Sequence, residues 1–429
     1  MPDPLAQPLH LPCGATLPNR LVKAAMTEGL ATSRGVPTPE LERLYGLWSD
    51  GGAGTLLTGN IQIDRNHLER PGNVIIDGEP EAELRAALSS WAKAGTRQGN
   101  HLWAQLSHAG RQTQKNVNPH PKAPSAVTLG LPGGQFGKPI PLTLAEIESI
   151  VKRFSIAAVA CQEAGFTGVQ IHAAHGYLLS EFLSPRANQR TDAYGGALEN
   201  RARLLLEVVG TVRAEVGTGF PLSVKLNSAD FQKGGFAFED SLRVAQWLER
   251  AGVDVIEVSG GTYEQPKLLG LAGIEEEEDQ HVAHSTRMRE AYFVDFAIAM
   301  QEQVSIPLMV TGGFRTRSVM EQAIESGSAD LIGLGRPLCV DTDAPAQLLA
   351  GAAELKRYEQ QLSLLPGCLS FLTQIPLVRS LAGFGVIYWF YAQLDALGRT
   401  GAPQPDISVF EAVKQVSRLQ NQLLKARRA

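Results

Sequence analysis

The chain has 429 residues, 44% of them hydrophobic and 19% charged, and a formal net charge of −5. This composition is that of a globular protein with a large buried core, and the lack of a basic surplus argues against nucleic acid as the main partner. The four cysteines are widely spaced, which disfavours a disulfide scaffold, a structural zinc site and a cysteine-ligated iron–sulfur cluster and predicts a cytoplasmic protein. We expect no secretory signal, and the most apolar stretch, residues 381–391, is shorter than the roughly 20 residues that span a bilayer.

In chain order, short apolar runs alternate with longer stretches that have helical apolar spacing. The predicted strands are residues 20–26, 54–58, 102–106, 168–171, 222–226, 253–258, 308–310 and 331–335. The predicted helices are residues 81–97, 144–164, 198–216, 241–251, 286–303 and 317–326. Eight strands that alternate with helices predict an α/β fold of the (β/α)8 TIM-barrel type. A doubly wound open sheet is the competing architecture, and it is disfavoured because no G-x-G-x-x-G follows a strand.

Two long connections and a C-terminal extension complete the predicted organisation. Residues 116–141, rich in proline and glycine, follow the third strand, and residues 263–281 follow the sixth and include an acidic run that we expect to be a solvated loop. Beyond residue 344 helical spacing returns, and the aromatic residues within 384–391 are expected to serve as core or as an oligomer contact. We therefore expect a barrel over residues 1–343 and a helical extension over residues 344–429 packed on it.

Polar residues at the C-terminal ends of barrel strands predict the active site. Gly312 and Gly313 follow the seventh predicted strand, and Gly335 and Arg336 end the eighth. Barrels commonly bind a phosphate at these two positions, because glycine lets main-chain N–H groups approach an anion and arginine adds a bidentate contact. The presence of both pairs, Gly312–Gly313 and Gly335–Arg336, favours a phosphate site over the alternative that these glycines are needed only to form turns.

Two histidines follow the fourth predicted strand. His172 and His175 are three residues apart, so their rings would share a face if a helical turn begins there. They could donate hydrogen bonds to one oxygen, ligate a metal or be structural. Hydrogen-bond donation ranks above metal binding because no cysteine or carboxylate follows at ligand spacing. Tyr177 could act as a proton donor, although its position alone would also suit packing.

A lysine lies within the fifth predicted strand. Lys225 is unusual there, because lysine is seldom buried without a partner. An anionic ligand at the barrel mouth would explain it, and a salt bridge to a carboxylate inside the barrel is the alternative.

The segments that contain these residues resemble the old yellow enzyme family of FMN-dependent ene-reductases and NAD(P)H:flavin oxidoreductases. The similarity spans about residues 9–341, and its motifs occur in the family's order. The matching segments are residues 17–20, 25–27, 105–111, 171–178, 181–185, 190–196, 199–201, 312–313 and 335–338.

The resemblance implies a bound FMN at the C-terminal mouth of the barrel. The main chain at Ala25 and Met26 and the Thr27 side chain would meet the flavin ring, and Gly59 would leave room beside it. The set that would bind the rest of the cofactor comprises Gln105 at the pyrimidine edge, Lys225 near N1 and O2, and Gly312, Gly313, Gly335 and Arg336 at the phosphate.

The implied reaction is a two-step hydride relay from NADH or NADPH through the flavin to an α,β-unsaturated carbonyl compound. His172 and His175 would hold the carbonyl oxygen, and Tyr177 would protonate the α-carbon. Two alternatives remain open: a flavin enzyme that mainly reduces oxygen, quinones or nitro compounds, and a barrel that binds a phosphate ligand without redox activity. A homo-oligomer is compatible with the sequence.

The sequence departs from the family in two places. One subgroup has cysteine where this chain has Thr27 and an aromatic residue close behind, whereas Glu28 and Gly29 follow here. Larger relatives carry a four-cysteine iron–sulfur site after the barrel, whereas this chain has only Cys339 and Cys368 in that region. These departures leave the flavin potential and the pocket shape open, and they argue against electron transfer through a cluster.

Overall fold

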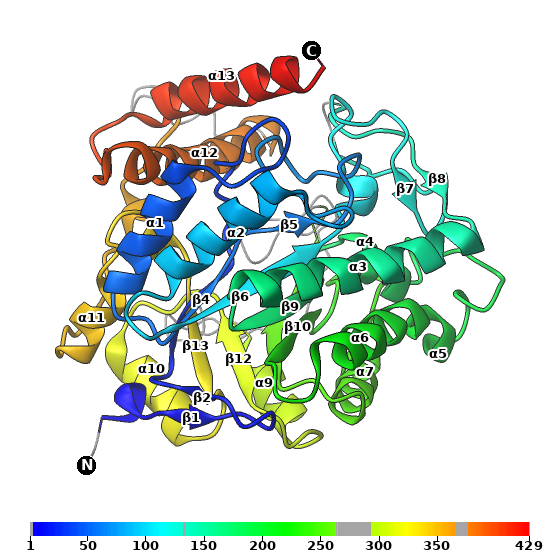
Figure 1. Cartoon of the computed structure of the whole chain (residues 1–429), viewed down its shortest axis with the longest axis horizontal. Coiled ribbons are helices and arrows are strands. Elements are labelled where there is room, and N and C mark those ends of the chain that lie inside the picture. The colour runs from blue at the N-terminus through cyan, green and yellow to red at the C-terminus, as the bar shows by residue number, and fades with distance from the viewer. Residues whose placement is uncertain (1–2, 132–133, 263, 265–292, 366–375, 429) are drawn as a thin grey trace.

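The computed structural model describes residues 3–131, 134–262, 264, 293–365 and 376–428 (Figure 1). The acidic run at 275–279 and Cys368 lie outside these residues. Among the described residues, no helix is long and apolar enough to cross a membrane.

Eight parallel strands form a closed barrel, which confirms the predicted TIM-barrel fold. Each strand pairs with its neighbour, and the last pairs with the first through Ile332 and Leu21. The barrel strands are β3 (Leu21–Lys23), β4 (Thr55–Leu57), β6 (His101–Ser107), β9 (Gly168–Ala173), β10 (Leu222–Asn227), β11 (Val255–Ser259), β12 (Leu308–Thr311) and β13 (Leu331–Leu334).

Helices surround the barrel (Figure 1). The outer helices are α1 (Pro39–Asp50), α2 (Ala82–Gly95), α3 (Leu144–Ala164), α6 (Arg203–Val216), α7 (Phe238–Arg250), α9 (Val294–Gln301) and α10 (Arg317–Glu325). Helix α3 begins with a capping box between Thr143 and Glu146, and it ends at Gly165, whose φ of 97° glycine adopts without strain.

Short strands, helices and turns lie in the connections and at the barrel floor. They are β1 (Leu9–His10), β2 (Thr16–Leu17), β5 (Ile61–Gln62), β7 (Lys122–Ala123), β8 (Ile140–Pro141), α4 (Leu178–Leu183), α5 (Leu198–Arg201), and the 3-10 turns η1 (Pro4–Ala6), η2 (Gly110–Gln112), η4 (Arg336–Cys339) and η5 (Tyr358–Gln360). Strands β1 and β2 form an antiparallel hairpin, and β5 extends the sheet beside β6.

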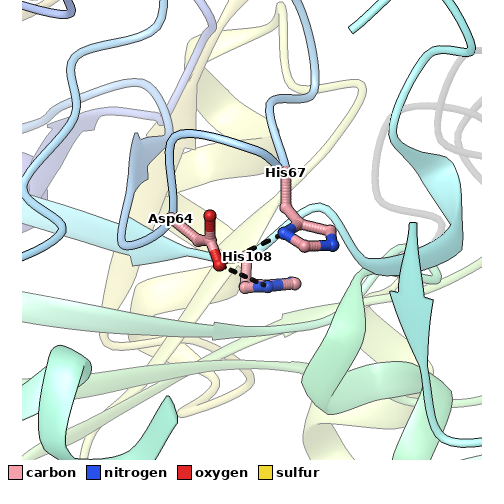
Figure 2. Close-up of side chains that lie close together, drawn as sticks. All are labelled: Asp64, His67 and His108. Atoms are coloured by element: carbon pink, nitrogen blue, oxygen red, sulfur yellow. Dashed lines mark ion pairs between the residues drawn. The ribbon is translucent and has the colours of Figure 1, made fainter. Parts of the chain in front are cut away.

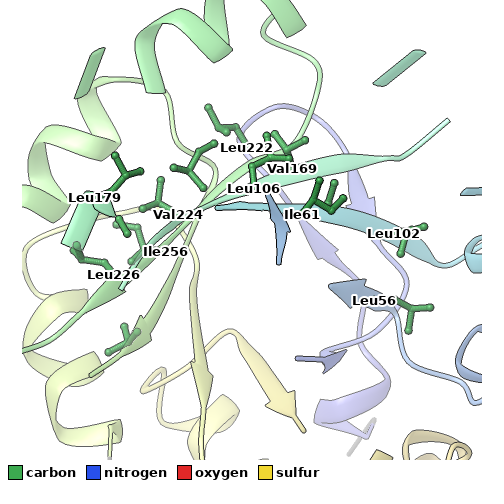
Figure 3. Close-up of a cluster of buried hydrophobic side chains, with 14 of the residues drawn as sticks. Leu56, Ile61, Leu102, Leu106, Val169, Leu179, Leu222, Val224, Leu226 and Ile256 are labelled. Carbon is green, nitrogen blue, oxygen red and sulfur yellow. The ribbon is translucent and has the colours of Figure 1, made fainter. Parts of the chain in front are cut away.

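Successive side chains along each strand point alternately out of and into the barrel, and this alternation separates two apolar cores. Outward-facing residues such as Leu102, Val224 and Ile256 pack between the strands and the helices (Figure 3). The inward-facing residues at the floor form a second apolar cluster, closed below by the hairpin residues Leu9 and Leu17. The inward-facing members of this floor are Val22, Leu57, Trp103, Val255, Met309 and Leu331. Two residues further along β6, β11 and β12 the inward positions are the polar residues Gln105, Glu257 and Thr311, so the site lies above an apolar floor.

The C-terminal extension contains α11 (Ala344–Leu349), α12 (Pro376–Thr400) and α13 (Val409–Arg428). Helices α12 and α13 lie side by side, and α12 packs on α1, where Arg43 Nη1 donates to Gly398 O at 2.6 Å (Figure 1). Trp389 and Phe390 are buried in the same core cluster as the barrel helices, whereas Phe384 is exposed. The extension thus packs on the barrel as expected, while the division at residue 344 stays a prediction.

Candidate functional site

A row of polar side chains crosses the barrel interior above the apolar floor. Lys225 Nζ lies 2.8 Å from Glu257 Oε1, Gln170 Nε2 donates to Glu257 Oε2 at 2.9 Å, and Gln105 Nε2 donates to Gln170 Oε1 at 2.7 Å. All four side chains are buried and come from the neighbouring strands β6, β9, β10 and β11. Each polar group therefore has a partner in the protein, as buried polar groups require.

Lys225 forms the salt bridge that the sequence left as the alternative. The parallel register places Lys225 opposite Glu257 on one side and opposite His172 on the other. The buried cation is balanced by Glu257, so its presence does not by itself require an anionic ligand. Its role toward a flavin stays a prediction.

The two histidines come together, but not through the helical turn that the sequence suggested. His172 is the fifth residue of β9, while α4 begins only at Leu178. His175 adopts a left-handed φ of 62°, which turns its ring toward His172, and the ring centroids are 5.1 Å apart. Asn227 Oδ1 accepts from His175 N at 3.1 Å, and Gln112 Nε2 donates to His175 O at 3.0 Å. Two side chains thus hold this unusual peptide in place.

The hydrogen bonds of the histidines determine which ring nitrogens can donate. His172 Nδ1 accepts from Ala174 N at 3.2 Å, so the neutral ring carries its proton on Nε2. His175 Nε2 lies 2.7 Å from Ser259 Oγ. Burial lowers the pKa of both histidines well below the ordinary value, and the positive charge of Lys225 adds to the effect. Both rings are therefore neutral at physiological pH.

Tyr177 completes the group. Its ring meets that of His172 edge-on, with centroids 4.9 Å apart, and it precedes α4 as the N-terminal capping residue. Tyr177 is 5% exposed, so the phenol is largely shielded from solvent. The three predicted residues thus form one cluster at the end of β9.

The end of β3 lies against the end of β4. Ala25, Met26 and Thr27 are half-buried, and Thr27 Oγ1 donates to Glu69 Oε2 at 2.7 Å. A Cβ on Gly59 would lie 2.9 Å from the Thr27 Cα and closer still to the Met26 carbonyl oxygen. This close approach of two main chains is itself a reason for glycine at position 59.

A buried charged network supports this junction, and sequence reasoning missed it. Lys23 is fully buried, and its Nζ donates to Leu57 O at 2.6 Å and lies 3.8 Å from Glu28 Oε1. Glu28 also accepts from the Tyr45 hydroxyl and from Gly59 N. Burial lowers the pKa of Lys23 to about 8, an effect that Glu28 opposes. Lys23 lies in an apolar run of the sequence, and nothing in that run indicates that Glu28 is its partner. The pairing is seen only in the tertiary structure.

The ends of β12 and β13 offer a main-chain cradle. Gly312 and Gly313 have φ values of 138° and 81°, which other residues rarely adopt. Gly335 precedes η4, whose first residue is Arg336. Thr311 Oγ1 is buried at this mouth and has no hydrogen-bond partner among the described residues. The predicted pairs Gly312–Gly313 and Gly335–Arg336 therefore follow two neighbouring strands, and the free Thr311 hydroxyl lies at the end of one of them, an arrangement that suits a phosphate.

A second arginine joins the predicted one. Arg315 Nη2 donates to Glu359 Oε1 at 2.8 Å, and Arg336 Nη1 lies 3.6 Å from the same oxygen. Arg315 is buried, and its Nε has no partner among the described residues. The sequence did not single out Arg315, although its position two residues after Gly313 was a usable indication of phosphate binding.

A third cluster contains Asp64, His67 and His108 (Figure 2), and sequence reasoning missed it. His67 Nδ1 and His108 Nε2 lie 3.3 Å and 4.0 Å from Asp64 Oδ2, and Arg153 Nη1 lies 2.8 Å from the same oxygen. The opposite ring nitrogens accept main-chain N–H groups, His67 Nε2 at 2.8 Å and His108 Nδ1 at 3.1 Å. The N–H group of each ring therefore faces Asp64, which favours a hydrogen-bonded cluster over a metal site, because a metal needs lone pairs at those nitrogens.

Comparisons with known proteins place these features in a family. The NADH-dependent flavin oxidoreductase iliE of Hypocrea jecorina (strain QM6a) is 38% identical over 360 residues, covering 80% of this chain and 88% of that protein. The NADH-dependent flavin oxidoreductase iccE of Talaromyces variabilis is 33% identical over 427 residues, covering 92% of this chain and 99% of that protein.

Solved structures agree with these relatives. The old yellow enzyme homologue from Zymomonas mobilis is 26% identical with a TM-score of 0.68, covering 84% of this chain and 97% of that one. Morphinone reductase in complex with tetrahydroNAD is 26% identical with a TM-score of 0.65, covering 82% of this chain and 92% of that one. The family model described as NADH:flavin oxidoreductase / NADH oxidase matches residues 4–354. The chain therefore belongs to this family and is an FMN-dependent NAD(P)H oxidoreductase of the old yellow enzyme type.

Proposed function

We propose that this enzyme uses NADH or NADPH to reduce the activated C=C bond of small α,β-unsaturated carbonyl compounds. The observation that carries the proposal is the cluster of His172, His175 and Tyr177 at the C-terminal end of β9. Two neutral imidazoles and one phenol are the groups that can hold a carbonyl oxygen and deliver a proton beside it.

The described residues fit an FMN at the barrel mouth. Gly312, Gly313, Gly335 and Arg336 would hold the phosphate, and the free Thr311 hydroxyl and Arg315 suit the same anion. The set proposed to meet the ring comprises Ala25, Met26, Thr27, Gly59, Gln105 and Lys225. When bound, FMN supplies the hydride chemistry, and the protein supplies position, charge and protons.

The hydrogen-bond pattern specifies how each histidine would act. The Nε2–H of His172 is the donor that this ring can offer to a substrate oxygen, because Nδ1 is occupied by Ala174 N. His175 can donate from Nδ1 only if the Ser259 hydroxyl donates to Nε2, which places Ser259 in control of the tautomer. Donation by both rings would draw electron density toward the carbonyl oxygen, and the Tyr177 hydroxyl would then protonate the α-carbon.

The test separates the two half-reactions. His172→Ala and His175→Ala should slow the reoxidation of reduced enzyme by an enone much more than the reduction of the enzyme by NAD(P)H, measured by stopped-flow absorbance. Ser259→Ala should resemble His175→Ala in a milder form. Equal effects on both half-reactions would contradict the proposed role at the substrate oxygen.

A second candidate activity is reduction of oxygen, because the NADH oxidase of Thermoanaerobacter brockii is 33% identical over 337 residues, covering 78% of this chain and 49% of that protein. Reoxidation of the reduced enzyme by oxygen, a quinone or a nitro compound faster than by any enone would favour that activity. A homo-oligomer also stays a prediction, which light scattering of the purified protein would decide.

A further inference from the structure

Helix α12 lies outside residues 4–354, which the family model matches, yet it approaches the connection between β3 and α1, because a Cβ on Gly398 would lie 2.9 Å from Leu30 Cδ1. The guanidinium of Arg70 lies over the ring of Tyr391, with Arg70 Cζ 3.8 Å from the ring centroid. Arg70 itself belongs to the connection that follows β4 and β5 and is 6% exposed. This contact therefore joins the C-terminal extension to the mouth of the barrel.

Arg70 fills the space beside Gly29. A Cβ on Gly29 would lie 2.6 Å from Arg70 Nη2 and 2.8 Å from Arg70 Cζ, and the φ of Gly29 is 70°. The guanidinium therefore occupies the space that a side chain at position 29 would need.

Residues 69 and 70 also hold Thr27 from two sides. Glu69 Oε2 accepts from Thr27 Oγ1 at 2.7 Å, and Arg70 Nη1 makes a long contact of 3.5 Å with Thr27 O. Arg70 forms no ion pair with any residue in the described ranges, and its buried Nε has no hydrogen-bond partner there. A buried guanidinium without an ion pair depends on its remaining contacts, and the face of the Tyr391 ring is one of them.

We propose that Tyr391 and Arg70 are positioning residues for the flavin site, so that the C-terminal extension forms part of that site. Tyr391 holds the guanidinium flat, and Arg70 with Glu69 fixes the main chain and hydroxyl of Thr27. The inference rests on the proposed function in one respect, namely that Thr27 meets the flavin ring. Loss of the ring face at position 391 would let Arg70 move and would alter how the flavin is held.

Three variants of α12 and one of Arg70 test this. Tyr391→Leu removes the ring face, Tyr391→Phe keeps it, and Phe384→Ala is a matched control at an exposed position of the same helix. Arg70→Met removes the cation. The readouts are the FMN dissociation constant, from fluorescence quenching by apoprotein, and the midpoint potential of bound FMN. Thermal unfolding is followed in parallel.

Tyr391→Leu and Arg70→Met should each raise the FMN dissociation constant by roughly 5- to 30-fold, the range expected for a desolvated cation–π contact, and should shift the potential. The double variant should be no worse than either single variant, because both remove the same contact. Tyr391→Phe and Phe384→Ala should stay within about twofold of the wild type.

Two results would overturn the inference. One is a Tyr391→Leu protein that unfolds at lower temperature but keeps the wild-type FMN dissociation constant and potential, which would make Tyr391 purely structural. The other is a Tyr391→Phe protein as impaired as Tyr391→Leu. If Tyr391→Leu does not fold, Arg70→Met and Arg70→Lys carry the same comparison. A wild-type protein that binds FMN but reduces no enone would refute the proposed function and leave this inference standing.

Discussion

The buried ion pair between Lys225 and Glu257 makes a quantitative prediction about stability. Lys225 is 3% exposed and Glu257 is fully buried, and the two charged atoms lie 2.8 Å apart. Lys225→Met leaves the carboxylate with the Gln170 amide as its nearest donor, at 2.9 Å. Breaking a buried pair costs about 3–5 kcal/mol, and the remaining hydrogen bond places our expectation near the lower end, at about 3 kcal/mol.

A second substitution, at Glu257, removes the carboxylate charge that Lys225→Met leaves unpaired. Glu257→Gln keeps an oxygen for Gln170 but carries no charge, so Lys225→Met with Glu257→Gln should recover most of the loss, roughly 2 kcal/mol. Chemical denaturation of the apoprotein, followed by tryptophan fluorescence, gives these differences without the contribution of FMN binding. A Lys225→Met protein destabilised by less than about 1 kcal/mol, or a double variant no more stable than the single one, would refute the reasoning.

Three further predictions follow from particular contacts. Gly59→Ala should lower the thermal unfolding midpoint and weaken FMN binding, because the new Cβ would meet the Met26 carbonyl; unchanged values would show that the two main chains can separate. Arg315→Ala should raise the dissociation constant of FMN about tenfold but leave that of riboflavin, which has no phosphate, unchanged; equal effects would exclude a phosphate contact. The lowered pKa values of His172 and His175 mean that the folded protein binds fewer protons than the unfolded chain, so these rings should reduce stability as the pH falls below about 6.5. The stability difference between the wild type and His172→Asn should therefore change between pH 7.5 and pH 5, and a constant difference would contradict the lowered pKa.

Local sequence patterns were sufficient to predict the barrel and the place of its site. Apolar runs and helical spacing depend only on neighbouring residues, so the eight strands could be recognised from the sequence before any tertiary contact was known. The rule that barrel sites lie at strand C-termini then pointed to His172, Lys225 and the glycines after β12. The family motifs added FMN and the reaction type.

The partners of these residues depended on the tertiary structure. Lys225 meets Glu257 because parallel register aligns β10 with β11, and no pattern within either strand reveals that alignment. His175 approaches His172 through a left-handed turn held by side chains from other segments, not through helical spacing. Tyr391 reaches Arg70 across more than 300 residues of sequence. The sequence alone determined which helices and strands form and that the functional residues lie at the C-terminal ends of the strands, since both follow from local periodicity and strand direction. Closure of the barrel and docking of α12 decided which side chains touch, because those contacts join segments that only the complete fold brings together.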